Sequence, residues 1–179
     1  MKKLTIAALV GGLILFIWQF LSWALLNLHA SEYQYTGHQD EILEFLSDKL
    51  TQGDYFLPTV PPGSSNEAEQ ELMRQHEGKP WAQIKYRSSM STAMGMNMVR
   101  SFIANVLAVL VLSWFLLKIR DNNLKTTVLI SIAVGAIGYL TIHYSSSIWF
   151  ENDTVAHLVD SLVQWGLCGT WLGWWLNRA

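Results

Sequence analysis

The strongest constraint in this sequence is the presence of four long apolar segments. A helix needs about 20 predominantly apolar residues to cross a bilayer, and segments of roughly that length run over 4–28, 98–117, 126–142 and 155–176. Charged residues make up only 15% of the chain, against about 25% in soluble domains. The sequence therefore predicts an all-α integral membrane protein built on a four-helix transmembrane bundle.

The first apolar segment follows Lys2 and Lys3, so a cleaved signal peptide is an alternative interpretation. Its apolar run is about 25 residues, whereas a signal core has about 7–15. The one site that ends in alanine, at Ala30, has Leu28 two places earlier, where a small residue is expected. We therefore predict an uncleaved membrane anchor.

The basic residues indicate an orientation, because short cytoplasmic connections are rich in Lys and Arg. Near the ends of the apolar segments, the basic residues of one side are Lys2, Lys3, Lys118, Arg120, Lys125 and Arg178. The connection 143–154, on the other side, has Glu151 and Asp153 and no Lys or Arg. Both termini are predicted to be cytoplasmic, which places residues 30–96 outside the cytoplasm.

Residues 30–96 are predicted to form a small α+β insertion between the first two spans. Apolar spacing predicts a helix over 39–50, and Ser64 with Glu67 resembles a capping box that opens a helix to about His76. Residues 55–60 and 81–87 are predicted strands that could pair with each other, and a turn at 61–63 follows the first strand and precedes the second helix. Because so short a segment has little apolar content, we expect it to rest on the membrane surface or on a partner.

The last span carries polar residues on one face and small residues on the other. At 100° per residue, the polar face groups His157, Asp160, Ser161, Gln164, Cys168, Trp171 and Trp175, and the opposite face has Gly166, Gly169, Thr170 and Gly173. Ser131, Gly135 and Gly138 form a second small-residue face, in the third span. Small residues allow close helix contact, so we expect the last span to be covered on both faces.

Two charges, Arg100 and Asp160, are predicted to lie at similar depth near the outer ends of their spans and to form an ion pair, because an unpaired charge there is costly. Further polar residues lie toward the same outer half, and together they would form a polar cup: Asn27, His29, Asn105, His143, His157 and Gln164. The cup is interpreted either as a hydrogen-bonded network that fixes helix packing, or as a small-molecule, quinone, proton or metal site.

Two further ligand sites are weaker hypotheses. His143 and His157 flank consecutive spans, so bis-histidine haem ligation is geometrically possible. Met90, Met94, Met96 and Met98 offer thioether sulfur, which suits Cu(I). Three of these methionines also repeat every four residues, which is ordinary packing at a helix start. No bound cofactor is predicted.

A resemblance adds to the topology. Trp18-x-x-x-Ser22-Trp23 followed by His29, Tyr55-Phe56-Leu57-Pro58 in the loop and Asp160-x-x-x-x-Trp165 in the last span resemble an uncharacterised group of small bacterial four-span inner-membrane proteins. This chain departs from the pattern at Asn27, where the group has a proline. The resemblance implies a multi-pass location in the bacterial inner membrane, and it brings no catalytic residues.

The sequence contains no complete nucleotide-binding, metalloprotease, redox or nucleophile-elbow motif. A net charge of -2 argues against a nucleic-acid binder. The leading expectation is a non-enzymatic accessory or interaction subunit that contacts the lipid bilayer and either a membrane-protein partner or a second copy of itself. The alternative is a small-molecule, proton or metal binding or transport protein that uses the outer polar cup or the Met-rich segment.

Overall fold

The computed structural model describes residues 2–120 and 122–178, which form two compact units. The helical unit comprises the residues up to Gln34 and from Ala93 onward. The insertion unit comprises Tyr35–Thr92. The boundary between them agrees closely with the predicted insertion at 30–96.

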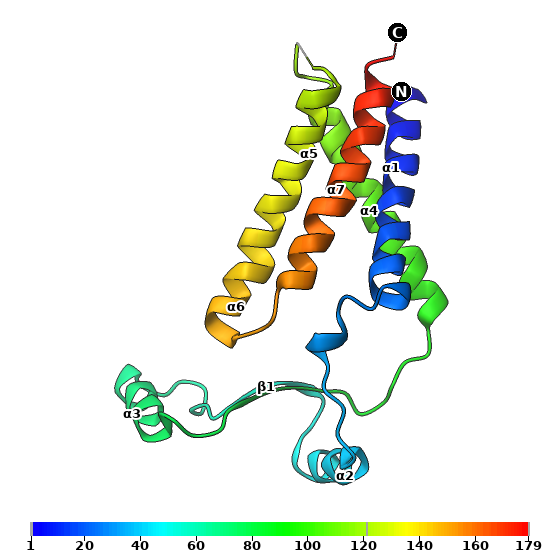
Figure 1. Ribbon diagram of the computed structural model, residues 1–179. Helices are drawn as coiled ribbons and strands as arrows, with labels where there is room; N and C mark the ends of the chain where they lie inside the picture. Colours follow the sequence, from blue (N-terminus) through cyan, green and yellow to red (C-terminus); the bar gives the residue numbers. More distant parts are fainter. Residues whose placement is uncertain (1, 121, 179) are drawn as a thin grey trace. The chain divides into compact units, whose positions relative to one another are not determined.

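The helical unit is built from long helices (Figure 1). Their bounds are α1 (Lys2–Phe20) with the π-helical turn η1 (Leu21–Leu25), the short 3-10 turn η2 (Ala30–Glu32), α4 (Met94–Leu116), α5 (Leu124–Gly138) with the π-helical turn η3 (Tyr139–Tyr144) and α6 (Ser145–Phe150), and α7 (Val155–Leu176). The last helix has the predicted bounds. The predicted connection 143–154 is shorter than expected. Residues 143–150 are helical, because no Gly or Pro interrupts them, and the helix ends only at Glu151, at φ 55°. Residues 151–154 alone connect it to α7.

Three helices among the described residues are long and apolar enough to cross a membrane: Lys2–Leu25, Met94–Leu116 and Leu124–Phe150. They correspond to the first three predicted spans. Although α7 has 22 residues, it is not one of the three. The polar side chains of His157, Asp160 and Gln164 lie in its first half.

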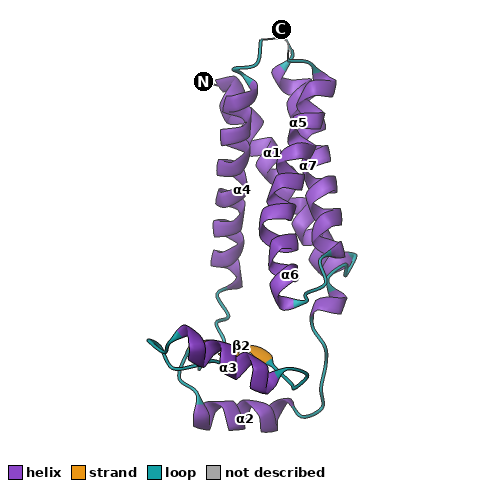
Figure 2. Cartoon of the chain, turned by 90° about the vertical axis from the view of Figure 1, so that its left-hand side faces the viewer, coloured by secondary structure: helices purple, strands orange, loops and turns teal. Residues whose placement is uncertain are grey.

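Helix α7 lies between α1 and α5, while α4 packs on α1 (Figures 1 and 2). Two indole nitrogens of α7 bond to the first two turns of α1: Trp171 Nε1 donates to the carbonyl of Ala7 at 3.3 Å, and Trp175 Nε1 donates to that of Lys3 at 2.9 Å. Both chain ends therefore lie at the same end of the helical unit, with the Lys3 amine hydrogen-bonded to the carbonyl of Arg178.

Small residues set the close approach of α5 and α7. A Cβ added at Gly169 would lie 2.7 Å from Ser131 Cβ, and one at Gly173 would lie 2.7 Å from the Leu124 side chain. On α5, a Cβ at Gly135 would lie 2.5 Å from the Ser161 carbonyl oxygen. The predicted coverage of α7 on both faces is confirmed. Gly138 does not belong to the contact face, because its added Cβ would meet nothing within 4 Å.

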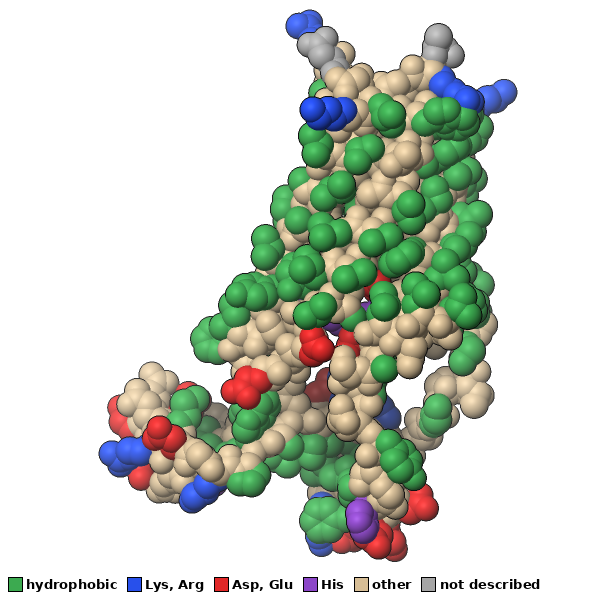
Figure 3. All heavy atoms as spheres, in the orientation of Figure 1, with side chains coloured by type: hydrophobic (Ala, Val, Ile, Leu, Met, Phe, Trp, Pro, Cys, Tyr) green, Lys and Arg blue, Asp and Glu red, His purple; other side chains and the backbone are tan. Residues whose placement is uncertain are grey.

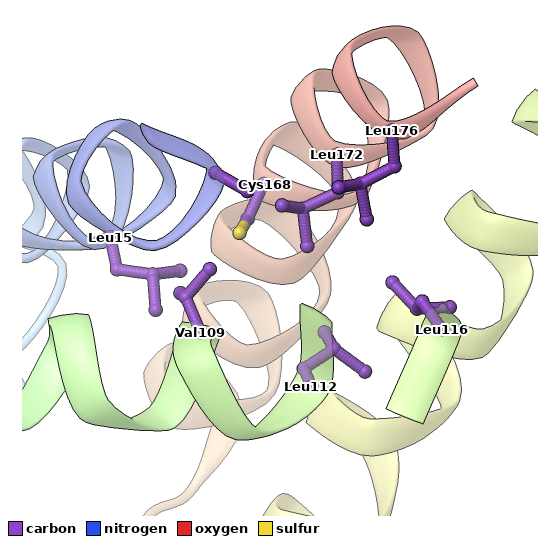
Figure 4. Packing of buried hydrophobic residues seen from close by; sticks show 8 residues of the cluster. Leu15, Val109, Leu112, Leu116, Cys168, Leu172 and Leu176 are labelled. Carbon is purple, nitrogen blue, oxygen red and sulfur yellow. The ribbon is translucent and has the colours of Figure 1, made fainter. Parts of the chain in front are cut away.

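The core of the helical unit is a narrow apolar seam shared by α1, α4 and α7 (Figure 4). Its buried residues are Ala7, Leu15, Val109, Leu112, Leu116, Cys168, Leu172 and Leu176. Large apolar side chains such as Leu13, Ile17 and Leu107 are about half exposed, at 44%, 47% and 55%. Hydrophobic side chains are spread over the visible surface of the helices (Figure 3). Extensive apolar exposure on long helices is typical of surfaces that face lipid.

The insertion unit contains two helices and a two-stranded antiparallel sheet. Its elements are α2 (Gln39–Lys49), β1 (Gly53–Leu57), α3 (Asn66–His76) and β2 (Ala82–Tyr86), and the strand register pairs Gly53 with Tyr86 and Leu57 with Ala82. The predicted helices and strand pairing are confirmed, although the first strand begins and ends earlier than the predicted 55–60. The predicted cap at Ser64 is one residue off, since it is Ser65 whose hydroxyl accepts from the Ala68 N–H.

The insertion unit has a thin core, as its composition predicted. None of its residues, all of which are described, belongs to the buried core. Between α3 and the end of β1 lies a groove of about 590 Å³, lined by Phe56, Pro58, Thr59, Val60, Glu69, Leu72, Met73, Arg74, His76 and Glu77. Its Met73 is 73% exposed.

Two glycines of α5 provide a matched test of the α5–α7 contact. Gly135→Ala is expected to lower the unfolding free energy by about 1–3 kcal/mol, because the new methyl group meets backbone that cannot rotate away. Gly138→Ala, three residues along the same helix, is expected to leave stability unchanged or to raise it slightly. Thermal unfolding of the purified chain in mild detergent measures both, and equal losses in the two variants would contradict the contact.

Candidate functional site

A buried carboxylate, Asp160, forms the centre of a polar cluster at the end of the helical unit opposite the termini. Oδ1 of Asp160 accepts hydrogen bonds from Trp18 Nε1 at 2.9 Å and from the Ser22 hydroxyl at 2.6 Å. Oδ2 lies 2.9 Å from His29 Nε2. Asp160 is only 8% exposed, and a buried carboxylate needs hydrogen-bond partners within the protein. Side chains from α1 and from the residues directly after it supply a partner for each of its two oxygens.

The backbone after α1 turns sharply to bring His29 onto Asp160. The π-helical turn η1 is followed by Asn27 at φ 51°, and the N–H of Leu28 then bonds back to the carbonyl of Ser22 at 3.0 Å. Asn adopts this left-handed conformation more readily than most residues. A proline, with φ fixed near −65°, would not fit at this position.

His29 is almost completely buried, at 3% exposure, and both of its ring nitrogens face carboxylates. Nδ1 is hydrogen-bonded to Glu32 Oε1, and Nε2 is hydrogen-bonded to Asp160. The ring also stacks on Trp23 with 3.9 Å between centroids and 4° between planes. Burial alone would lower the pKa of His29, but the hydrogen bonds and charges of Glu32 and Asp160 outweigh it and raise that pKa above its ordinary value.

Glu32 connects His29 to a second histidine. Its Oε1 lies 3.2 Å from His157 Nε2 at the start of α7, and the His157 ring stacks on that of His143, from η3, at 3.9 Å and 16°. One ligand atom from each of His29, Glu32 and His157 lies within 4.8 Å of the others. Two imidazoles and a carboxylate at this spacing are groups that bind divalent transition metals.

The other half of the predicted polar cup is a separate amide cluster. Gln19 Nε2 donates to Asn105 Oδ1 and to Gln164 Oε1, both at 3.2 Å, and Asn105 Nδ2 donates back to Gln19 Oε1 at 2.9 Å. These amides connect α1, α4 and α7. Neutral amides that pair with one another across helices fix packing and need no ligand.

The predicted Arg100–Asp160 ion pair is wrong. Within residues 2–120 and 122–178, Asp160 bonds to Trp18, Ser22 and His29, and Arg100 forms no ion pair. Arg100 is exposed on α4, where its long stem lets the charged end reach the aqueous boundary without a partner. The face of α7 that carries Asp160 is directed to α1, which supplies neutral donors and a histidine.

The remaining predicted residues lie at the edge of the cluster or outside it. Asn27 lines a shallow pocket of about 350 Å³ with Trp23, His29, Ala30 and Tyr33. The four methionines are exposed surface side chains: Met90 94%, Met94 73%, Met96 63% and Met98 42%. His143 and His157 stack face to face, which leaves no room for a haem between their rings.

Four residues of the two clusters were not among the predicted site residues: Trp18, Gln19, Ser22 and Glu32. Trp18, in α1, and Ser22, in the η1 turn that continues it, are four residues apart and lie on one face, which the polar stripe of α7 could have indicated. Glu32 follows His29 by three residues, a spacing that brings the two together in a turn. The signal for Glu32 was therefore present, in a segment whose turn conformation the sequence does not specify.

Comparison with protein-family models, with curated proteins and with solved structures gives no significant match.

Exchanging Asp160 and Arg100 for alanine tests which residue holds the cluster together. Asp160→Ala is expected to cost at least about 2 kcal/mol of stability, because it leaves buried donors of Trp18, Ser22 and His29 without an acceptor. Arg100→Ala is expected to stay within about 0.5 kcal/mol, and the double variant to equal the sum of the two within the same margin. Unfolding in detergent measures all three variants. A loss of stability in the double variant much smaller than that sum would support the Arg100–Asp160 ion pair.

Proposed function

We propose that this chain is a non-enzymatic, multi-pass protein of the bacterial inner membrane, which binds a small ligand or ion at the non-cytoplasmic end of a four-span bundle. Both termini would be cytoplasmic and the insertion unit would lie outside. Membership in the group of small bacterial four-span proteins that the sequence resembles is part of the same proposal.

The proposal of a fourth span is supported by the length and position of α7. Twenty-two residues at 1.5 Å each extend about 33 Å, enough to cross the hydrocarbon core. The helix lies alongside two of the apolar spans, α1 and α5. Its Asp160 and Gln164 have hydrogen-bond partners within the bundle, so they are not exposed to lipid.

The proposed orientation rests on the distribution of charge along the helical unit. Lys and Arg side chains gather at the end with the two termini (Figure 3), where Lys3 and Arg178 meet. Glu32, Glu151 and Asp153 belong to the segments at the other end. A basic end of this kind is typical of the cytoplasmic side.

The single observation that carries the binding function is His29, buried between the carboxylates of Glu32 and Asp160. Buried charges are an expensive way to fix helices, and the Gln19, Asn105 and Gln164 cluster already provides neutral hydrogen bonds between the same helices. The side chains of Glu32 and His157 retain 18% and 22% exposure. A ligand can therefore reach the cluster from the open end.

The expectation of an accessory subunit has its own support in the insertion unit. Its groove, with Met73 exposed, has the apolar character of a surface that contacts another protein. We rank this function second, because the groove has no polar group arranged as specifically as those around His29.

The orientation predicts a clear outcome for reporter fusions. A reporter that is active only outside the cytoplasm is expected to be silent when fused after Ala179 and active when inserted at Gly63, a turn glycine at φ 87°. A fusion between Leu117 and Leu124 should again be silent. Activity at the C-terminus with silence at Gly63 would reverse the orientation.

The binding function predicts that the chain, extracted in mild detergent, carries a bound small molecule or ion. Native mass spectrometry of the full-length chain should show an added mass that Glu32→Ala removes. Glu41→Ala is the matched control, since Glu41 also pairs with a histidine three residues before it, His38, but at an exposed position. A stoichiometric protein partner, or a wild-type chain with no added mass, would contradict the binding function.

A further inference from the structure

We infer that the ligand of this cluster is a divalent transition-metal ion of the zinc class, held by the imidazoles of His29 and His157 and the carboxylate of Glu32. The inference rests on the proposed binding function and specifies its ligand. Glu32 Oε1 is the central atom, because it is hydrogen-bonded to His29 Nδ1 and lies 3.2 Å from His157 Nε2.

The spacing of the three donors is close to what such an ion requires. Zinc bonds to nitrogen and oxygen at about 2.0–2.2 Å, so neighbouring donors of a tetrahedral site lie about 3.3–3.5 Å apart. The ligand atoms of His29, Glu32 and His157 lie within 4.8 Å of one another. A small rotation of Glu32, whose side chain is partly exposed at 18%, would adjust the distances of its oxygen to the two imidazole nitrogens.

Asp160 completes the arrangement that orients a metal-bound histidine. A ligating imidazole commonly donates its other ring N–H to a carboxylate, which fixes the ring and its tautomer. Here His29 Nε2 lies 2.9 Å from Asp160 Oδ2, which directs Nδ1 to Glu32. Asp160 is itself fixed by Trp18 and Ser22. Asp160 is therefore a positioning residue and does not contact the ion.

Aromatic stacking fixes the planes of both imidazoles. Trp23 lies against the His29 ring at 3.9 Å, and His143 lies against the His157 ring at 3.9 Å. Rings that are fixed before the ion arrives lose little conformational entropy when it binds. The two rings are therefore preorganised, which favours ion binding and is not required for helix packing.

The donor set selects the class of ion. Two nitrogens and one oxygen suit zinc and its first-row neighbours, whereas calcium and magnesium prefer oxygen alone and Cu(I) prefers sulfur. The charges agree as well, since Glu32 and Asp160 together balance a divalent cation in a site that is mostly shielded from water. Three protein ligands leave a fourth position for water or for a transported or exchanged ligand.

Metal titration of the full-length chain in detergent, after removal of metal with a chelator, tests the inference. We expect one Zn²⁺ per chain by calorimetry, and a tetrahedral Co²⁺ absorption spectrum that Zn²⁺ displaces. His157→Ala and Glu32→Gln should each weaken binding at least about 100-fold. His38→Ala, at the exposed pair with Glu41, should change neither the affinity nor the spectrum.

Asp160→Asn separates positioning from support of the fold. It is expected to weaken binding about 10–100-fold and to shift the Co²⁺ absorption band, since the hydrogen bond to His29 changes. A variant that only loosened the fold would bind fewer ions per chain with an unchanged band. Circular dichroism identifies a variant that fails to fold, and Glu32→Gln, the most conservative change, then decides the test.

The outcomes distinguish this inference from the binding function beneath it. If the wild-type chain binds no Zn²⁺ or Co²⁺ at one per chain, or if His38→Ala weakens binding as much as His157→Ala, the metal inference is overturned. An organic molecule bound to the wild-type chain and lost in Glu32→Ala would then leave the binding function in place. A chain that binds neither metal nor organic molecule contradicts both.

Discussion

The structure of the helical unit depends on one carboxylate, Asp160, and on how its negative charge is satisfied away from water. An apolar bundle tolerates such a group only when donors surround it. Trp18 and Ser22 donate from one face of α1, and His29 approaches from the turn beyond it. The register between α1 and α7, the π-helical end of α1 and the left-handed backbone at Asn27 all serve this contact. The Trp171 and Trp175 indoles hold the same two helices together toward the termini.

Much of the fold can be predicted from the apolar and small-residue patterns of the sequence. Apolar length predicts the three helices that are long and apolar enough to cross a membrane. Small residues predict the close α5–α7 contact, and apolar spacing predicts α2, α3 and the strand pair. The extent of the third helix was less accessible, because Ser145–Phe150 is polar enough to look like a connection and becomes helical only as a continuation of η3. The cap at Ser65 was missed by one residue for a similar reason: two adjacent serines offer equivalent hydroxyls, and only the backbone angles choose between them.

The candidate site was predictable in its histidines and its aspartate but not in its pairing. Asp160, His157 and His29 could be grouped by depth, since residues at matching levels of neighbouring spans can meet. Depth does not say which face of a helix is directed to which neighbour, so matching depth alone pairs Arg100 with Asp160. Charge does not single out neutral donors such as Trp18 and Ser22, although their hydrogen bonds satisfy the carboxylate. Glu32 is not predictable from the sequence in the same way, because its position depends on η2, a single 3-10 turn that follows the left-handed backbone at Asn27.

The two π-helical turns each contain a residue of the polar cluster: Ser22 lies in η1 and His143 lies in η3. Each π-helical turn holds an extra residue relative to an α-helix, and such turns occur often at functional positions. Removing one residue from η1 would rotate everything after it by about 100° relative to Trp18. The chain should therefore tolerate exchanges of side chains across its lipid-facing surface while tolerating no change of length in these two short stretches. In a lineage of such proteins, insertions and deletions would accumulate in the loops of the insertion unit and spare residues 18–29 and 139–144.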